Sequence, residues 1–161
     1  FKNNPAIEIN YHGEGDINKD LSKYLIEHSI KYVNLTGRYL KGEEEGLYSN
    51  NDIINVLRYN DCTNNRTALP NRLYNAVFYG KPLLAFEGTY LADVIEKYGL
   101  GLTVNSLENI ENVIIDYVQH FNTAKYEINR LSFFSEIIYE NNAFLEKLRS
   151  FVYQNEQHMG V

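Results

Sequence analysis

Short apolar segments alternate along the chain with stretches in which apolar residues recur every three to four positions. The first pattern predicts strands and the second predicts helices, such as one at Ile17–Ser29. Five strands are predicted, at Ile7–Tyr11, Tyr32–Leu35, Asp52–Leu57, Pro82–Phe86 and Leu100–Val104. This alternation is typical of parallel strands joined by crossover helices. The sequence therefore predicts a three-layer α/β fold with a mainly parallel sheet.

The remaining segments complete a single predicted domain that covers residues 1–161. A short helix is expected at Lys41–Asn50 and a long polar loop at Arg58–Thr67. After residue 106 the chain is predicted to be helical, in three successive segments. We expect residues 5–121 to form the αβ core and residues 122–161 to form C-terminal helices.

The stretch LPNRLYNAVFYGKPLLAF, residues 69–86, predicts a helix that leads directly into a buried strand. Thr67 is expected to cap this helix, and Pro70 suits its first turn, where a missing N–H costs little. Gly80 is expected to end it in the left-handed conformation. The expected buried stripe of the helix consists of Leu73, Ala76 and Val77.

The start of this helix allows two interpretations. In the first, the helix only packs on the sheet. In the second, its free N–H groups face a ligand crevice and bind an anion, with Arg66 or Arg72 nearby. Asn71 and Asn75 lie four residues apart on the polar face of the helix, where their amides would be available to a ligand.

Polar residues concentrate in the loops that follow the predicted strands. In parallel α/β sheets the ligand crevice lies at the carboxyl ends of the strands. The candidate binding residues are therefore Gly13, Glu14, Arg38, Arg66, Thr67, Asn71, Arg72, Asn75, Gly88 and Thr89. A plain turn at Gly13 and a surface role for Arg38 remain alternatives for those two loops. His12, at the end of a predicted strand, is a further candidate for ligand contact, and no residue is assigned to catalysis.

Composition narrows the class of partner. The formal net charge is −6, which argues against nucleic acid, because phosphate backbones bind to basic surfaces. Cys62 is the only cysteine, and the four histidines share no ligand spacing, so no metal site is predicted. No apolar run approaches the roughly 20 residues of a membrane-spanning helix.

The order of the motifs carries a resemblance to a known family. ALPNRLYNAVFYGKPLLA followed by GTYLADVIEKYGLGLTV resembles the donor-binding, C-terminal half of GT-B glycosyltransferases, specifically glycosyltransferase family 4, the group 1 transferases. INYHGEGD and VNLTGRYLKGEEEGLYSNNDIINV are similar to the strands and loops that precede this part in the family. The likeness covers most of residues 7–121.

The resemblance implies a Rossmann-like domain that holds a nucleotide diphosphate sugar without a metal or other cofactor. A missing N-terminal half would present the glycan or lipid-linked acceptor, and the reaction would be retaining hexosyl transfer in bacterial surface polysaccharide synthesis. The implied location is cytoplasmic, with peripheral attachment to the inner face of the membrane through the missing half as an option. The isolated chain would then be inactive.

Two departures from the family pattern leave an alternative open. Many members carry two Glu residues seven positions apart, and the matching positions here are Thr67 and Asn75. The first strand and helix of the family's domain, with an Arg and a Lys for the diphosphate, have no counterpart upstream of Ala6. The chain is thus expected to be truncated, with a gap or a substitute strand in its sheet. The alternative function is a degenerate module that binds nucleotide or protein without catalysis.

Overall fold

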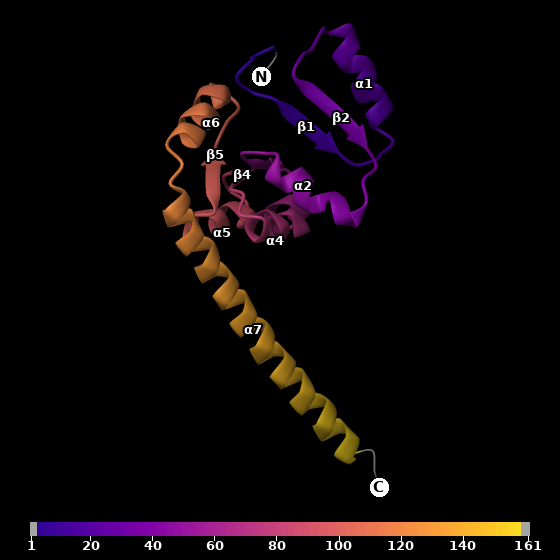
Figure 1. The fold of residues 1–161 in the computed structure, drawn as a ribbon. Coiled ribbons are helices and arrows are strands. Elements are labelled where there is room, and N and C mark those ends of the chain that lie inside the picture. The colour runs from indigo at the N-terminus through magenta and orange to yellow at the C-terminus, as the bar shows by residue number, and fades with distance from the viewer. Residues whose placement is uncertain (1–2, 159–161) are drawn as a thin grey trace.

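The fold was determined as a computed structural model that describes residues 3–158 (Figure 1). Strands and helices alternate through most of it, as the hydrophobic pattern predicts. The elements are β1 (Ile9–His12), α1 (Asn18–Glu27), β2 (Val33–Gly37), η1 (Lys41–Glu43), α2 (Glu44–Ser49), β3 (Ile54–Asn55), α3 (Thr63–Thr67), α4 (Asn71–Phe78), β4 (Leu83–Phe86), α5 (Tyr90–Tyr98), β5 (Gly101–Val104), α6 (Ile110–Gln119) and α7 (Thr123–His158).

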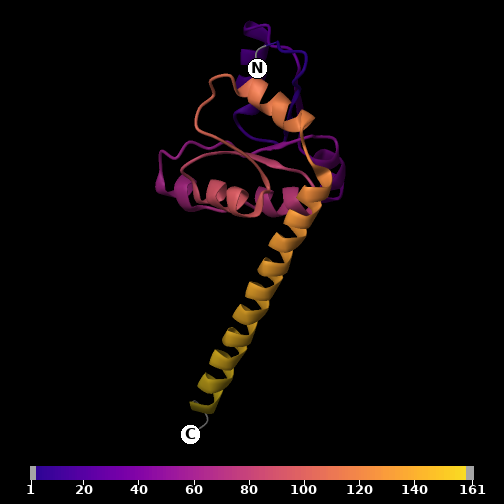
Figure 2. The same cartoon turned by 90° about the vertical axis from the view of Figure 1, so that its left-hand side faces the viewer.

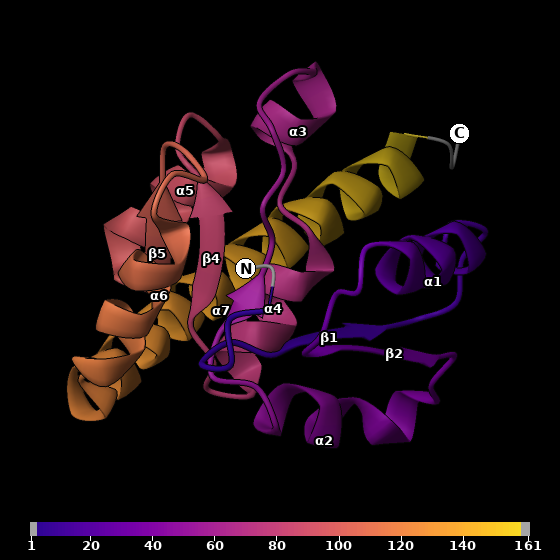
Figure 3. The ribbon, with the colours of Figure 1, turned by 90° about the horizontal axis from the view of Figure 1, so that it is seen from above.

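All strand pairs are parallel, which confirms the predicted α/β class with parallel sheets. The strands form two sheets, where the sequence predicts one sheet with a gap or a substitute strand. β1 pairs with β2, and β3, β4 and β5 form a three-stranded sheet in that order. Seen from above, β1 runs across the direction of β4 instead of alongside it (Figure 3). The break in the sheet falls between β1 and β3.

The core surrounds the three-stranded sheet. Leu83 and Ala85 of β4 face a cluster formed with α4, α5 and α7, whereas Leu84 and Phe86 face α6. Helices therefore cover both faces of this sheet (Figure 2). The five largest side chains that are fully buried are Leu73, Leu83, Ile95, Leu100 and Val77. Successive residues of β4 are all buried because each face of the strand meets an apolar helix.

α4 follows the predicted pattern in its interior but not at its start. Leu73, Ala76 and Val77 form the buried stripe, as expected. The position before the helix is Pro70, and the expected cap, Thr67, belongs instead to α3, where its hydroxyl donates to the carbonyl of Thr63 at 2.9 Å. The prediction that Thr67 caps this helix is therefore wrong, and so is the prediction of an unbroken loop at Arg58–Thr67.

A cap at the start of α5 and a close approach of β5 to β4 fix this part of the fold. Thr89 caps α5, because its side-chain oxygen accepts a hydrogen bond from the N–H of Ala92 at 3.1 Å. A side chain at Gly101 would collide with the backbone of Leu83 in the neighbouring strand. Only glycine therefore lets β5 approach β4 at this point.

α7 is one continuous helix of 36 residues, where two successive segments were expected. Its first part packs on the core through Tyr126 and Phe133, and the Tyr126 hydroxyl donates to the carbonyl of Lys81 at 2.7 Å. Beyond this contact α7 extends away from the rest of the molecule (Figures 1 and 2). Within residues 3–158, no helix combines the length and apolar character needed to cross a lipid bilayer.

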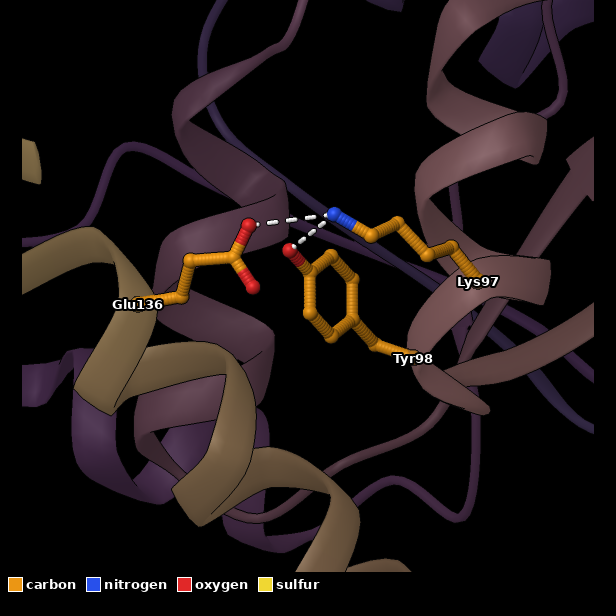
Figure 4. Close-up of polar contacts among 3 residues, drawn as sticks. All are labelled: Lys97, Tyr98 and Glu136. Carbon is orange, nitrogen blue, oxygen red and sulfur yellow. Dashed lines mark hydrogen bonds and ion pairs between the residues drawn. The ribbon is translucent and has the colours of Figure 1, made fainter.

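An ion pair joins α7 to α5 at the surface. The ammonium group of Lys97 lies 3.0 Å from a carboxylate oxygen of Glu136 and donates to the Tyr98 hydroxyl at 2.6 Å (Figure 4). The hydrogen bonds from Tyr98 and Lys97 lower the pKa of Glu136. This contact between α5 and α7 is exposed to solvent.

Candidate functional site

The loops after β1 and β2 lie side by side. The N–H of Gly13 donates to the carbonyl of Gly37 at 2.8 Å, and the side chain of Asn18 donates to the carbonyl of Gly13 at 2.9 Å. Glu14 and Arg38 follow these two glycines, and both side chains are exposed. The structure therefore brings three candidate positions, in two loops, to one end of the small sheet.

The loop after β4 packs against the loop after β3. Gly88 has a φ of 74°, and a Cβ atom there would lie 2.8 Å from the amide nitrogen of Asn60. The ring of Tyr59 stacks on Phe86 with 4.9 Å between centroids, and Tyr59 is 61% exposed. Glycine at position 88 thus permits a close approach of the two loops, and Tyr59 offers an open ring face beside it.

Thr89 has a structural role at this edge. Its side chain is only 4% exposed, and its hydroxyl donates to the carbonyl of Phe86 at 2.9 Å while it caps α5. Binding of a ligand through Thr89 remains a prediction, and it would require the hydroxyl to leave these partners.

Arg66 and Thr67 belong to α3, which stands apart from β1 and β2 (Figure 3). The guanidinium of Arg66 reaches the hydroxyl of Thr63 at 3.4 Å, at the limit of a hydrogen bond. Both candidates therefore lie on a short separate helix, not on α4.

The first turn of α4 holds the best-placed cation among the candidates. Both Asn71 and Arg72 are exposed, and the guanidinium of Arg72 donates to the carbonyl of Asn55 at 2.9 Å, at the end of β3. One turn later, Asn75 hydrogen-bonds the hydroxyl of Tyr48; burial raises the pKa of this tyrosine, and the bond from Asn75 partly opposes the change. The start of α4 is thus linked to both β3 and α2.

A cavity of about 250 Å³ lies between β1 and β3. Its lining is mostly apolar, and a hydrogen bond of 3.2 Å from Asn10 to Asn51 crosses between its two sides. Of the ten candidate residues only Arg72 lines it; His12, Tyr39 and Tyr48 do so as well. Sequence reasoning missed this cavity. A clue was available, because asparagine is depleted in paired strands, yet Asn10 and Asn55 lie in β1 and β3.

No cluster of three or more His, Cys, Asp or Glu side chains suited to a metal ion occurs within the described part of the chain. The arrangement instead offers hydrogen-bond donors, exposed aromatic rings and arginine side chains around the carboxyl ends of parallel strands. These groups are suited to binding a polar or anionic ligand.

Neither a scan against protein-family models nor a search of curated proteins finds a match to this chain.

Proposed function

We propose that the chain is the donor-binding domain of a glycosyltransferase that moves a hexose from a nucleotide diphosphate sugar to a glycan or lipid-linked acceptor. The observation that carries the proposal is the position of Arg72. It lies in the first turn of α4, at the carboxyl end of β3, and lines the cavity beside that strand.

In this proposal the diphosphate lies at the start of α4. The free N–H groups of a helix N-terminus attract anions, and Arg72 adds a full positive charge close by. Tyr59, exposed beside the Gly88 loop, provides a face on which a base can stack. Asn75 would contact the ribose by exchanging its bond to Tyr48. A separate acceptor domain of the same protein, at the cytoplasmic face of the membrane, would complete the enzyme.

One observation favours the alternative, a module that binds nucleotide or protein without catalysis. Thr67 occupies the position of a family carboxylate, and its hydroxyl is bonded within α3. The hydroxyl of Thr89 is likewise bonded within its own loop and helix. Both hydroxyls are uncharged and already hydrogen-bonded, so neither can replace a carboxylate in the transfer of a sugar.

The charge at the start of α4 can be tested with Asn71→Asp. An aspartate in the first turn interacts favourably with the positive end of the helix dipole, so the thermal unfolding midpoint should stay equal or rise slightly. The same charge repels a phosphate, so calorimetry with UDP, GDP and ADP should show binding at least about threefold weaker for whichever nucleotide binds the parent chain. Asn112→Asp is the matched control, because Asn112 is exposed in the first turn of α6. Equal loss in both variants would contradict the proposed site.

A second pair of variants, Arg72→Gln and Lys81→Gln, separates the specific contribution of Arg72 from the effect of losing any positive charge. Arg72→Gln should weaken nucleotide binding about tenfold, since a hydrogen bond to a charged group contributes roughly 1.5–3 kcal/mol. Lys81→Gln should leave it unchanged, although Lys81 also donates to a backbone carbonyl, that of Ser49, at 2.9 Å. Retained affinity in Arg72→Gln, or no binding of any nucleotide by the parent chain, would overturn the proposed donor site.

A further inference from the structure

The far part of α7 projects from the molecule with apolar side chains along it. α7 contacts the core through Tyr126 and Phe133 and then extends away from the globular part (Figures 1 and 2). Past this contact the side chains of Ile138, Leu145 and Leu148 are exposed. Most of the stability of a helix in a protein comes from the packing of its apolar face, so this part of α7 gains stability from a partner.

The apolar positions of α7 follow a heptad repeat, in which steps of three and four residues alternate along one side of the helix. We call this side the seam. Its positions between residues 131 and 152 are Leu131, Phe134, Ile138, Asn141, Leu145, Leu148 and Val152. Phe134 packs against the core, and the other apolar members are 37–59% exposed. A spacing that averages 3.5 residues is the pattern by which one helix pairs with another in a coiled coil.

The seam lies on a different side of α7 from the core contact. Tyr126 and Phe133 are buried against the core, and their positions are roughly a third of a turn away from the seam. Leu131 lies on the seam and stays exposed, although Phe133 next to it is buried. A partner helix can therefore lie along the seam without displacing the globular part.

The charges of α7 suit pairing with a second copy of the same helix. Four of the five charged residues between residues 131 and 152 occupy heptad positions away from the seam, namely Glu136, Glu140, Glu146 and Lys147. The fifth, Arg149, lies beside the seam. Flanking positions five residues apart meet across a parallel coiled coil, so Arg149 of one copy lies next to Phe144 of the other. A guanidinium beside an aromatic ring is a favourable contact, and no like charges oppose each other.

The one polar seam residue, Asn141, selects the orientation. In a parallel, in-register pair Asn141 faces Asn141 of the second copy, and the two amides can hydrogen-bond each other. In an antiparallel pair it faces Leu145, and the buried amide has no such partner. The branched residues Ile138 and Val152 alternate with Leu148 in the order that favours two strands.

We propose that two copies of this chain associate through α7 as a parallel, in-register coiled coil along residues 131–152. The paired segment is about 32 Å long, at 1.5 Å per residue. Because it contains only three heptads, the association depends on protein concentration. This interface goes beyond the nucleotide site and does not depend on it.

Sedimentation equilibrium of the full 161-residue chain tests the association, because it measures mass without regard to the elongated shape. Between about 1 μM and about 1 mM the mass should rise from 18.7 kDa toward twice this value. A mass that remains that of one chain throughout this range overturns the proposal, and so does a mass that exceeds two chains.

Two matched variants locate the interface. Leu148→Glu places two carboxylates opposite each other in the seam, so the dissociation constant should rise at least tenfold. Tyr139→Glu makes the same kind of change at an exposed position away from the seam and should leave association unchanged. Neither residue is part of the buried core, and unfolding midpoints close to that of the parent verify that both variants are folded. Equal effects of the two substitutions would overturn the proposed seam.

Cysteine cross-linking tests the parallel order, in chains in which the exposed Cys62 is replaced by Ser. Val152→Cys places two thiols face to face in the parallel pair, within reach of a disulfide. In an antiparallel pair position 152 faces Phe134, and the two thiols are roughly 27 Å apart along the axis. Mild oxidation of the associated chain should therefore yield a covalent dimer with Val152→Cys and not with Tyr139→Cys. A Val152→Cys chain that associates without forming this disulfide would overturn the parallel arrangement.

Discussion

The two sheets of this chain differ in what covers them. β4 is buried along its whole length, with helices on both faces, whereas β1, β2 and α1 contain no buried residue. The small sheet is held by its own ladder and by asparagine bonds, such as Asn34 to Glu8 at 2.7 Å and Asn34 to Asn10 at 2.9 Å. A parallel sheet normally requires cover on both faces, so the β1–β2 unit is the less stable part.

The largest expected difference between the two sheets comes from removing an apolar side chain. Leu83→Ala in β4 should lower the free energy of unfolding by about 2–5 kcal/mol, because Leu83 is fully buried. Leu35→Ala in β2 should cost less than about 1.5 kcal/mol, since Leu35 is only partly buried. Urea denaturation measures both variants. A larger cost for Leu35→Ala would reverse the order of stability stated above.

A smaller difference in unfolding free energy is expected between two threonine-to-alanine substitutions, one at the three-stranded sheet and one at the small sheet. Thr89→Ala removes the cap of α5, which should cost about 1 kcal/mol of unfolding free energy. Thr36→Ala in β2 removes an exposed hydroxyl that contacts His12 at 2.8 Å, and its cost should stay within about 0.5 kcal/mol. Thermal denaturation at constant pH compares the two. Equal shifts in midpoint would show that the cap contributes no more than an exposed contact.

The smallest effect is expected at the exposed contact between α5 and α7 (Figure 4). Hydrogen bonds from Tyr98 and Lys97 hold the pKa of Glu136 below its usual value. A carboxyl whose pKa is lower in the folded state stabilises the fold above its unfolded pKa, near 4.3, and this contribution disappears as the pH falls through the folded value. Glu136→Gln should therefore reduce the midpoint slightly at pH 7 and not at about pH 2. A difference that persists unchanged at acidic pH would contradict the assignment.

The sequence predicts the three-stranded part far better than the rest. β4 begins one residue later than expected and ends where expected, because an unbroken apolar run fixes a strand buried on both faces. β3 is much shorter than the predicted Asp52–Leu57, since the length of a strand depends on its partners and β3 pairs with only one strand among residues 3–158. The split into two sheets is likewise a property of pairing between distant segments.

The candidate site shows the same division. The sequence correctly identifies the loops that lie together after β1 and β2, because parallel pairing places them at one edge. It assigns Thr67 to the wrong helix, since a capping residue type does not tell which of two successive helices it serves. The shape of the cavity beside β3 cannot be predicted from local patterns, because its walls come from β1, α2, β3 and α6; the asparagines in β1 and β3 indicate only that these strands are unusual.

The length of α7 has a hydrodynamic consequence. At 1.5 Å per residue its 36 residues extend about 54 Å, and much of that lies beyond the globular part (Figures 1 and 2). A molecule of this shape experiences more friction than a sphere of the same 18.7 kDa mass, so it sediments more slowly and elutes earlier from a sizing column than its mass indicates. Its rotation in solution is also unequal about its axes: turning end over end displaces far more water than spinning about α7.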